Sequence, residues 1–129
     1  MKKTIPVLLF SFFLLVCLSS CGGKIVKLDE NSNGQTIELN KGQTLSISLQ
    51  GNPTTGYNWE LAEVDQSILK PMGEADYKSD SMLIGSGGVY TFKFEALDSG
   101  TTDLKLIYFR SFEKDTPPIN TFELNVTVK

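Results

Sequence analysis

Apolar residues alternate with polar or smaller ones along almost the whole chain after residue 35, and this period of two limits what the chain can fold into. Successive side chains of a strand point to opposite faces, so the alternation is typical of strands with one buried face. No stretch sustains apolar residues at i, i+3, i+4 and i+7 over three turns, as an amphipathic helix requires. We therefore predict an all-β domain. The alternating positions are Ile37 and Leu39; Leu45, Ile47 and Leu49; Tyr57, Trp59 and Leu61; Tyr90, Phe92 and Phe94; Leu104, Leu106 and Tyr108; and Phe122, Leu124, Val126 and Val128.

Turn-forming residues separate these segments at a spacing of roughly ten residues, which is typical of an antiparallel β-sandwich. The turns fall at Asn40-Lys41-Gly42, Gly51-Asn52-Pro53, Gly85 to Gly88, Asp98-Ser99-Gly100 and Thr116-Pro117-Pro118. The number of segments predicts about seven or eight strands. Residues 62–84 are less regular, and both Ser67–Met72 and Ala75–Ile84 are compatible with a short edge strand or with a single helical turn.

The N-terminal segment has the order of a secretory signal. Lys2 and Lys3 precede an apolar run from Ile5 to Leu18, and a positive head followed by a hydrophobic stretch engages the export machinery. The run is shorter than the ~20 residues that span a bilayer as a helix, so a permanent transmembrane anchor is the weaker alternative. We expect an exported protein with residues 1–20 as its signal peptide.

Both cysteines, Cys17 and Cys21, lie in this region. Leu18-Ser19-Ser20-Cys21 resembles the bacterial lipoprotein box, which implies that Cys21 becomes the lipidated first residue of the mature chain and anchors it to the membrane. Ordinary cleavage beside small residues is the alternative. Gly22 follows Cys21 in place of an acidic residue, which favours attachment to the outer membrane of the bacterial envelope. The mature chain would then have no thiol for a disulfide or a nucleophile.

Residues 21–35 are predicted to form the lipidated N-terminus and a linker, and residues 36–129 the folded domain, because residues 22–35 are rich in Gly, Asn, Ser and charge. Asp29, Asn31, Asn33 and Gly34 follow the first half of a calcium-binding loop. Asn40 stands where that loop needs a bidentate Glu, so the flexible linker is the better interpretation and no metal site is expected.

The chain contains no histidine, and most general-base, triad and zinc chemistry at neutral pH depends on imidazole. Its net charge of -3 leaves no basic surface for nucleic acid. The fifteen acidic residues are scattered, without the aromatic cluster of a sugar-binding cleft. We therefore expect neither an enzyme nor a cofactor.

One loop contains residues that restrict its backbone conformation. Pro53 fixes its own φ and extends Asn52, while the flanking Gly51 and Gly56 allow backbone angles closed to other residues. Thr54 and Thr55 lie between them, with little side-chain entropy to lose and no charge to desolvate on entering a narrow cleft. An ordinary turn between two strands is the alternative interpretation. The full segment is Gly51-Asn52-Pro53-Thr54-Thr55-Gly56-Tyr57.

Two further segments are candidates for binding. Gly85-Ser86-Gly87-Gly88 would let the backbone approach a partner closely enough to pair with it, or is simply a mobile hairpin. Arg110-Ser111-Phe112 follows a predicted strand, and Arg and aromatic residues are enriched at binding hot spots. The alternative for Phe112 is a ring that covers the end of the sandwich.

In this order, the three segments resemble the chagasin-like family of cysteine protease inhibitors, whose pattern is N-P-T-T-G-[YF], then G-x-G-G, then R-P-[WF]. Residues 52–57 and 85–88 match fully. Arg110 and Phe112 match the third motif, whereas Ser111 replaces its proline, which loosens that loop.

The resemblance implies an immunoglobulin-like sandwich that blocks papain-like proteases reversibly. It implies that Asn52 to Gly56 enter the cleft beside the catalytic cysteine, that Gly85 to Gly88 pair by backbone with one wall, and that Arg110 and Phe112 pack on the other. We expect a monomer whose partner is a papain-like cysteine protease. A membrane-tethered binding or assembly module of the cell envelope is the alternative function.

Overall fold

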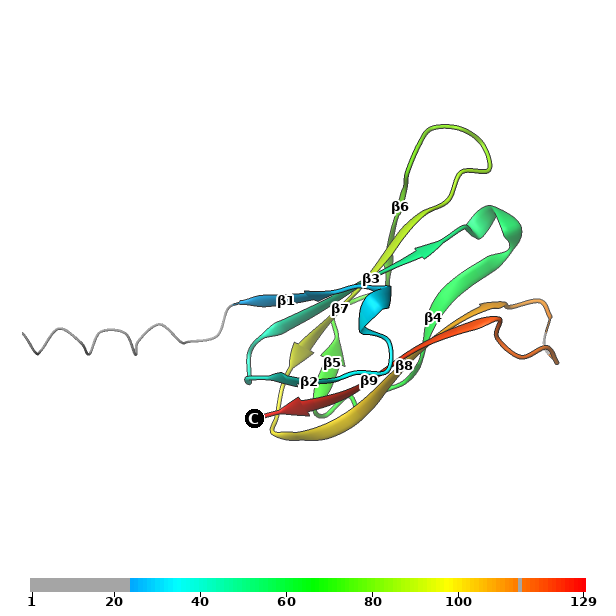
Figure 1. Cartoon of the computed structure of the whole chain (residues 1–129). Helices are drawn as coiled ribbons and strands as arrows, with labels where there is room; N and C mark the ends of the chain where they lie inside the picture. The colour runs from blue at the N-terminus through cyan, green and yellow to red at the C-terminus, as the bar shows by residue number, and fades with distance from the viewer. Residues whose placement is uncertain (1–23, 114) are drawn as a thin grey trace, which may run out of the picture.

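The structure is a computed structural model that describes residues 24–113 and 115–129. Nine strands form two sheets in the described part of the chain, and Figure 1 shows them in order of colour. The strands are β1 (Ile25–Leu28), β2 (Thr36–Leu39), β3 (Thr44–Gly51), β4 (Tyr57–Glu63), β5 (Leu69–Pro71), β6 (Asp76–Ser79), β7 (Gly88–Ala96), β8 (Gly100–Arg110) and β9 (Asn120–Val128). Two short 3-10 turns are η2 (Glu30–Ser32) and η3 (Pro53–Thr55).

The two sheets make a sandwich, as the alternation predicts. One sheet has five strands in the order β1-β3-β7-β5, with β6 also on β7, and the other has four in the order β2-β9-β8-β4. Antiparallel pairs predominate, but β1 with β3 and β2 with β9 run parallel. The prediction of an all-β sandwich is confirmed, while the described part of the chain has nine strands instead of seven or eight because residues 25–28, predicted as linker, add a strand.

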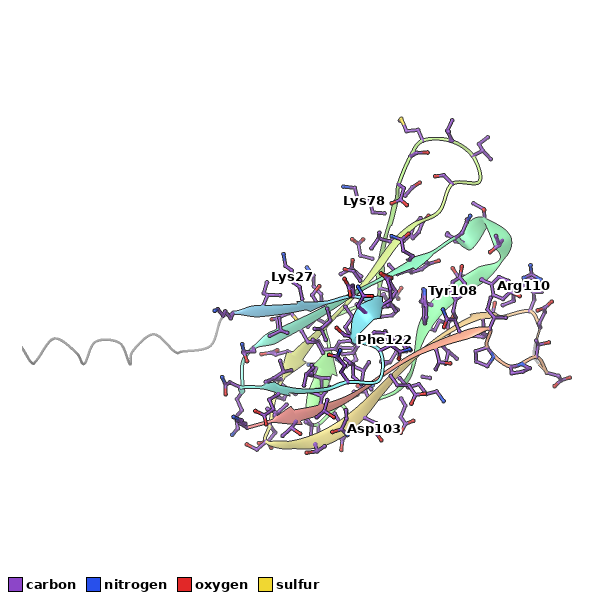
Figure 2. All side chains as sticks on the ribbon, viewed as in Figure 1. Lys27, Lys78, Asp103, Tyr108, Arg110 and Phe122 are labelled. Atoms are coloured by element: carbon purple, nitrogen blue, oxygen red, sulfur yellow. The ribbon has the colours of Figure 1, made fainter. Side chains whose placement is uncertain are left out.

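Alternate residues of the long strands fill the space between the sheets. Leu45, Ile47 and Leu49 of β3 lie in one buried cluster with Leu104 and Leu106 of β8 and with Phe122, Leu124, Val126 and Val128 of β9. Figure 2 shows the labelled Phe122 within this core. Each such side chain contributes about 1.5–3 kcal/mol by leaving water, so packing stabilises a domain whose described part has no cysteine.

The linker predicted for residues 22–35 is wrong from Ile25 onward. β1 pairs in register with β3, Ile25 opposite Thr44 and Leu28 opposite Ile47. Residues 29–35 then cross to the other sheet, where the Gly34 amide donates to the Glu123 carbonyl at 2.7 Å. The polar composition suggested a linker, but Val26 and Leu28 reach the core and the backbone finds partners in both sheets.

The calcium-like residues have structural partners of their own in this crossing segment. Asp29 accepts a hydrogen bond from the Asn31 amide at 2.9 Å and so caps η2. Asn33 accepts from the Glu123 amide at 2.8 Å. Within residues 24–113 and 115–129, no three or more His, Cys, Asp or Glu side chains gather as metal ligands would.

The irregular stretch 62–84 supplies edge strands. β5 and β6 both pair with β7, β5 at Phe94 to Ala96 and β6 at Gly88 to Thr91. Of the two alternatives left open by the sequence, the strand is therefore correct for both segments. Among residues 24–113 and 115–129, no helical segment has both the length and the hydrophobicity of a membrane span. The predicted signal peptide, residues 1–20, and the predicted lipidation site Cys21 lie outside the described residues.

Candidate functional site

All three predicted loops lie at the same end of the sandwich. Gly51 of β3 is opposite Gly88 of β7, so the loops that follow β3 and precede β7 are neighbours. Tyr57 of β4 is opposite Arg110 of β8, which brings the third loop beside the first. Figure 1 shows the three connections projecting together beyond the sheets, away from the chain's C-terminus. The fold thus assembles segments up to sixty residues apart in the chain into one surface.

Asn52 fixes the first loop from inside. Its side-chain oxygen accepts hydrogen bonds from the Thr54 amide at 3.1 Å and from the Thr54 hydroxyl at 2.6 Å. Its carbonyl accepts from the Thr55 hydroxyl at 2.6 Å. This is the capping role for which Asn is suited, with Pro53 at the first position of η3. Both Thr hydroxyls at the exposed tip are therefore already hydrogen-bonded before any partner arrives.

Asn52 also joins the first loop to its neighbours. Its side-chain amide donates to the Gly85 carbonyl at 3.0 Å, which links the first and second loops. Its backbone amide donates to the Tyr108 hydroxyl at 2.8 Å, which links the loop to β8. Tyr108 was not among the predicted site residues, because its alternation with Leu106 marks it only as a strand residue.

Gly56 ends η3 in the left-handed conformation, with φ of 89°. Side chains are disfavoured there, as the sequence predicts. The structure adds a second reason for glycine: a Cβ at this position would lie 3.0 Å from the Phe112 ring. The first and third loops therefore touch at Gly56.

Arg110 holds the first and third loops together. Its Nε donates to the Thr55 carbonyl at 3.1 Å, and its guanidinium lies 4.3 Å from the centre of the Tyr57 ring. The same group lies 5.8 Å from the centre of the Phe112 ring and 3.3 Å from the Glu113 carboxylate. The predicted packing of Arg110 on a protease wall stays a prediction; within the protein, these contacts show that the side chain orders the loops.

A row of stacked rings connects the loop end to the core. Tyr57 stacks on Tyr108 with ring centres 5.4 Å apart, and Tyr108 packs on the buried Trp59 at 5.0 Å. Figure 2 shows Tyr108 and Arg110 following one another along β8 toward the loops. Aromatic pairs of this kind contribute about 0.5–1.5 kcal/mol beyond area burial. The loops consequently stand on a rigid part of the sandwich.

The second motif divides into two parts. Gly88 is buried between β3 and β6 and pairs with both, so no added strand fits beside it. A Cβ at Gly88 would collide with the Lys78 carbonyl and the Tyr77 hydroxyl, and Gly87 accepts from the Asp80 amide. The prediction that the whole motif offers its backbone to a partner is therefore wrong for Gly88, which internal packing requires. Gly85 and Ser86 remain in the connection itself.

The structure places an apolar tip, Met82-Leu83-Ile84, directly before this motif. Leu83 is 76% exposed, and its two neighbours are fully exposed. A contiguous apolar patch on the surface marks an interaction site more often than scattered single residues do. The sequence analysis missed this tip, although three large apolar residues between Ser81 and Gly85, with no period of two, were the available signal.

The third loop is constrained without the family's proline. The Glu113 amide donates to the Arg110 carbonyl at 3.1 Å, and the Arg110–Glu113 ion pair spans the same turn. Ser111 is exposed and occupies the second position of this turn, where proline is favoured. Phe112 is 68% exposed, so it does not cover the end of the sandwich as the alternative interpretation has it.

A β-sandwich that presents interlocked loops and exposed apolar groups at one end has the arrangement of a binding protein, in which loops on a rigid scaffold form the contact surface. The comparisons agree. The family model described as "Chagasin family peptidase inhibitor I42" matches residues 38–126. The chain therefore belongs to the chagasin family of peptidase inhibitors, a family of inhibitors and not of enzymes.

Curated relatives and solved structures support this membership. Amoebiasin-1 of Entamoeba histolytica is 33% identical over 107 residues, covering 81% of this chain and all of the relative. Chagasin of Trypanosoma cruzi is 30% identical over 88 residues, covering 65% of this chain and 80% of the relative. The crystal structure of the Entamoeba histolytica cysteine protease inhibitor EhICP2 superposes with a TM-score of 0.74 at 26% identity, covering 82% of this chain and 96% of that one. PbICP-C, solved in complex with falcipain-2, gives 0.58 at 25% identity, covering 83% and 100%.

Proposed function

We propose that this protein inhibits papain-like cysteine proteases reversibly by occluding the active-site cleft with its three loops. The observation that carries the proposal is the hydrogen-bonded union of the loops at one end of the sandwich, through Asn52 to Gly85 and Arg110 to Thr55. Family membership and the complex of one structural relative with falcipain-2 support the choice of target class.

The geometry favours inhibition over cleavage. Binding energy is reduced by every side chain and loop that must become ordered at the interface, and here the first loop is ordered in advance. Its tip is a 3-10 turn, not an extended segment. A protease needs an extended peptide with its scissile bond in attack geometry, so the turn fills the cleft without offering such a bond.

Several exposed side chains lie at and around this tip. Thr54 and Thr55 form the central tip; the loop of Phe112 adjoins it through the pairing of β4 with β8, and the connection that carries residues 82–84 adjoins it through the pairing of β3 with β7. None of these side chains is charged, so little polar group desolvation opposes burial on binding. Residues 52–57, 85–86 and 110–112, with residues 82–84, are the proposed contact surface.

We also infer that the protein is exported and anchored to the bacterial envelope through a lipid on Cys21, with the outer membrane as the favoured site. The positive head, the apolar run and the box ending at Cys21 support this. Growth with labelled palmitate should mark the wild-type chain and leave the Cys21→Ser chain unlabelled; label on the variant would refute the assignment.

The inhibitory function is tested by titrating the chain from Gly22 onward against papain, with trypsin as the serine protease control. We expect inhibition of papain alone. Combining Thr55→Ala with Phe112→Ala should weaken it at least tenfold, or ~1.4 kcal/mol. Phe112 loses an exposed contact group, and Thr55 loses the hydroxyl that binds Asn52.

The control is Lys129→Ala, whose side chain pairs with Glu38 away from the loops and should leave inhibition unchanged. Full inhibition by the double variant would contradict the loop assignment. Failure of the wild-type chain to inhibit papain and related enzymes, with retained binding to envelope material, would favour the tethered binding module.

A further inference from the structure

The direction of β1 shows at which end of the sandwich the described chain begins. β1 runs parallel to β3, and β3 leads directly into the loop that begins at Asn52. The start of β1 therefore points away from that loop. Ile25 lies opposite Thr44, the first residue of β3, whereas Gly51 at the other end of β3 adjoins the loops.

Other elements mark the same two ends. The connections 40–43 and 97–99 and the C-terminal Lys129 lie at the Ile25 end, because β7 reaches Ala96 there and the Lys129 amide donates to the Leu39 carbonyl. Figure 1 shows the start of β1 at the side where the C-terminus lies, with the loop end opposite. Eight residues of β3 at about 3.3 Å each separate the two ends by roughly 25 Å.

The pairing of β1 also shortens the connection to Cys21. Residues 22–24 alone separate Cys21 from Ile25, so four Cα steps span at most about 14 Å. A linker reaching to residue 35 would have let the domain turn freely in every direction. A connection of three residues onto a strand that is fixed in the sheet keeps the Ile25 end next to whatever holds Cys21.

We propose that the anchored protein stands with its Ile25 end at the membrane and its three loops facing the aqueous compartment, where they reach proteases in solution. The proposal rests on the proposed inhibitory function and on the anchor at Cys21. The partner it fits is a protease whose cleft is approached from the water side, roughly 25 Å or more from the lipid surface. A protease whose cleft opens close to the same bilayer would be out of reach.

The test compares two attachment points on vesicles. The chain from Gly22 onward has no cysteine and retains all nine strands, so a single cysteine introduced by Lys24→Cys or Asp115→Cys couples it to a maleimide lipid at one place. Lys24 precedes β1, and Asp115 lies in the connection after β8 at the loop end. After the remaining maleimide is quenched, inhibition of papain is measured with a small fluorogenic peptide, each uncoupled variant serving as its own reference.

We expect attachment at Lys24→Cys to keep the inhibition constant within about threefold of that of the uncoupled variant. Attachment at Asp115→Cys should raise the inhibition constant at least tenfold, or ~1.4 kcal/mol, because it turns the loops to the lipid. Equal losses at both positions, or no loss at either, would overturn the proposed orientation. Absence of inhibition by the uncoupled variants would instead refute the proposed function. In that case the orientation is measured by energy transfer from a dye to labelled lipid around the acylated chain, with the dye attached at Leu83→Cys or at Ser99→Cys. Stronger transfer from position 99 than from position 83 supports the orientation. Equal or weaker transfer from position 99 refutes it.

Discussion

At the scale of single residues, the loops depend on polar groups whose partners are distant in sequence. The Asn52 amide donates to the Tyr108 hydroxyl, fifty-six positions away, and the Arg110 Nε donates to the Thr55 carbonyl, fifty-five positions away. Each bond fixes a loop atom to a strand of the sandwich. A side chain that never touches the protease can therefore influence how well the loops bind.

Tyr108→Phe tests this influence. Removing the hydroxyl leaves the Asn52 amide without its acceptor but keeps the ring that packs on Tyr57 and Trp59. A hydrogen bond of this kind contributes about 0.5–1.5 kcal/mol, so we expect inhibition to weaken about three- to tenfold. The inhibition constant against papain is the measurement.

Tyr90→Phe is the matched control, since its hydroxyl donates to Asn58 at 2.7 Å and does not reach the loops. Tyr90→Phe should lower the free energy of unfolding about as much as Tyr108→Phe does, while leaving the inhibition constant unchanged. If both variants weaken inhibition equally, the effect is one of general stability and the positioning role of Tyr108 is wrong.

Tyr90 also predicts an alkaline limit to stability. Burial, with smaller contributions from Tyr108 and Tyr77, raises the pKa of Tyr90 to about 12 from a usual value of 10. The unfolded chain therefore loses this proton at lower pH than the folded one, and the stabilisation, complete below pH 10, is lost as the pH rises through 12. Guanidinium unfolding between pH 9 and 12 should show a smaller decline for Tyr90→Phe than for wild type; equal declines would contradict the assignment.

At the scale of elements, the hairpin of β6 and β7 serves both structure and binding. Its base is fixed by Gly88, which lies between β3 and β6, while its tip carries Met82, Leu83 and Ile84 into solvent. Figure 1 shows this hairpin as the longest projection from the sandwich. An apolar tip on an ordered stem gains binding energy on burial without a cost to the fold.

Leu83→Ser with Ile84→Ser is expected to weaken inhibition of papain at least tenfold. Burial of one such side chain contributes about 1.5–3 kcal/mol, and both are exposed in the free protein. The free energy of unfolding should change by less than about 0.5 kcal/mol, as for other surface positions. Titration of papain and urea unfolding measure the two quantities.

Leu97→Ser provides the comparison for this pair, because Leu97 is also exposed but lies at the opposite end of the sandwich. It should inhibit as well as wild type. Inhibition that survives the loss of both tip residues would show that residues 82–84 do not contact the protease.

At the scale of the whole molecule, the segment before β2 closes the sandwich. β1 adds to one sheet, residues 29–35 cross between the sheets, and β2 adds to the other. Val26 and Leu28 pack against the core on the way. A chain that begins at Thr36 therefore lacks part of its fold, whereas the linker interpretation would have it unaffected.

Removing residues 22–35 should lower the free energy of unfolding by about 2–3 kcal/mol, from the two partly buried side chains and the lost backbone pairing. Urea unfolding of this chain is compared with that of a chain beginning at Lys24, which retains β1 and should be as stable as one beginning at Gly22. Equal stability of the short and long chains would restore the linker interpretation.

The residues that face the core could be read from the chain alone. Alternation at Leu45, Ile47 and Leu49, and at Phe92 and Phe94, predicted the buried side of each strand, because that period is a local property of extended backbone. The constrained loop at Pro53 and Gly56 was likewise local, since proline and glycine act on their own backbone angles.

The tertiary structure decided what depends on pairing between distant segments. It made a strand of residues 25–28, required Gly88 for packing, and directed Arg110 to the Thr55 carbonyl instead of outward. The alternation of apolar and polar residues shows which face of the sheet a side chain occupies. It does not show which strand lies beside it, because register is set by contacts across the sheet. The sequence therefore determined the core-facing side of the long strands and the stiffness of the first loop, and the fold determined the short edge strands, how the loops hold one another and where they point.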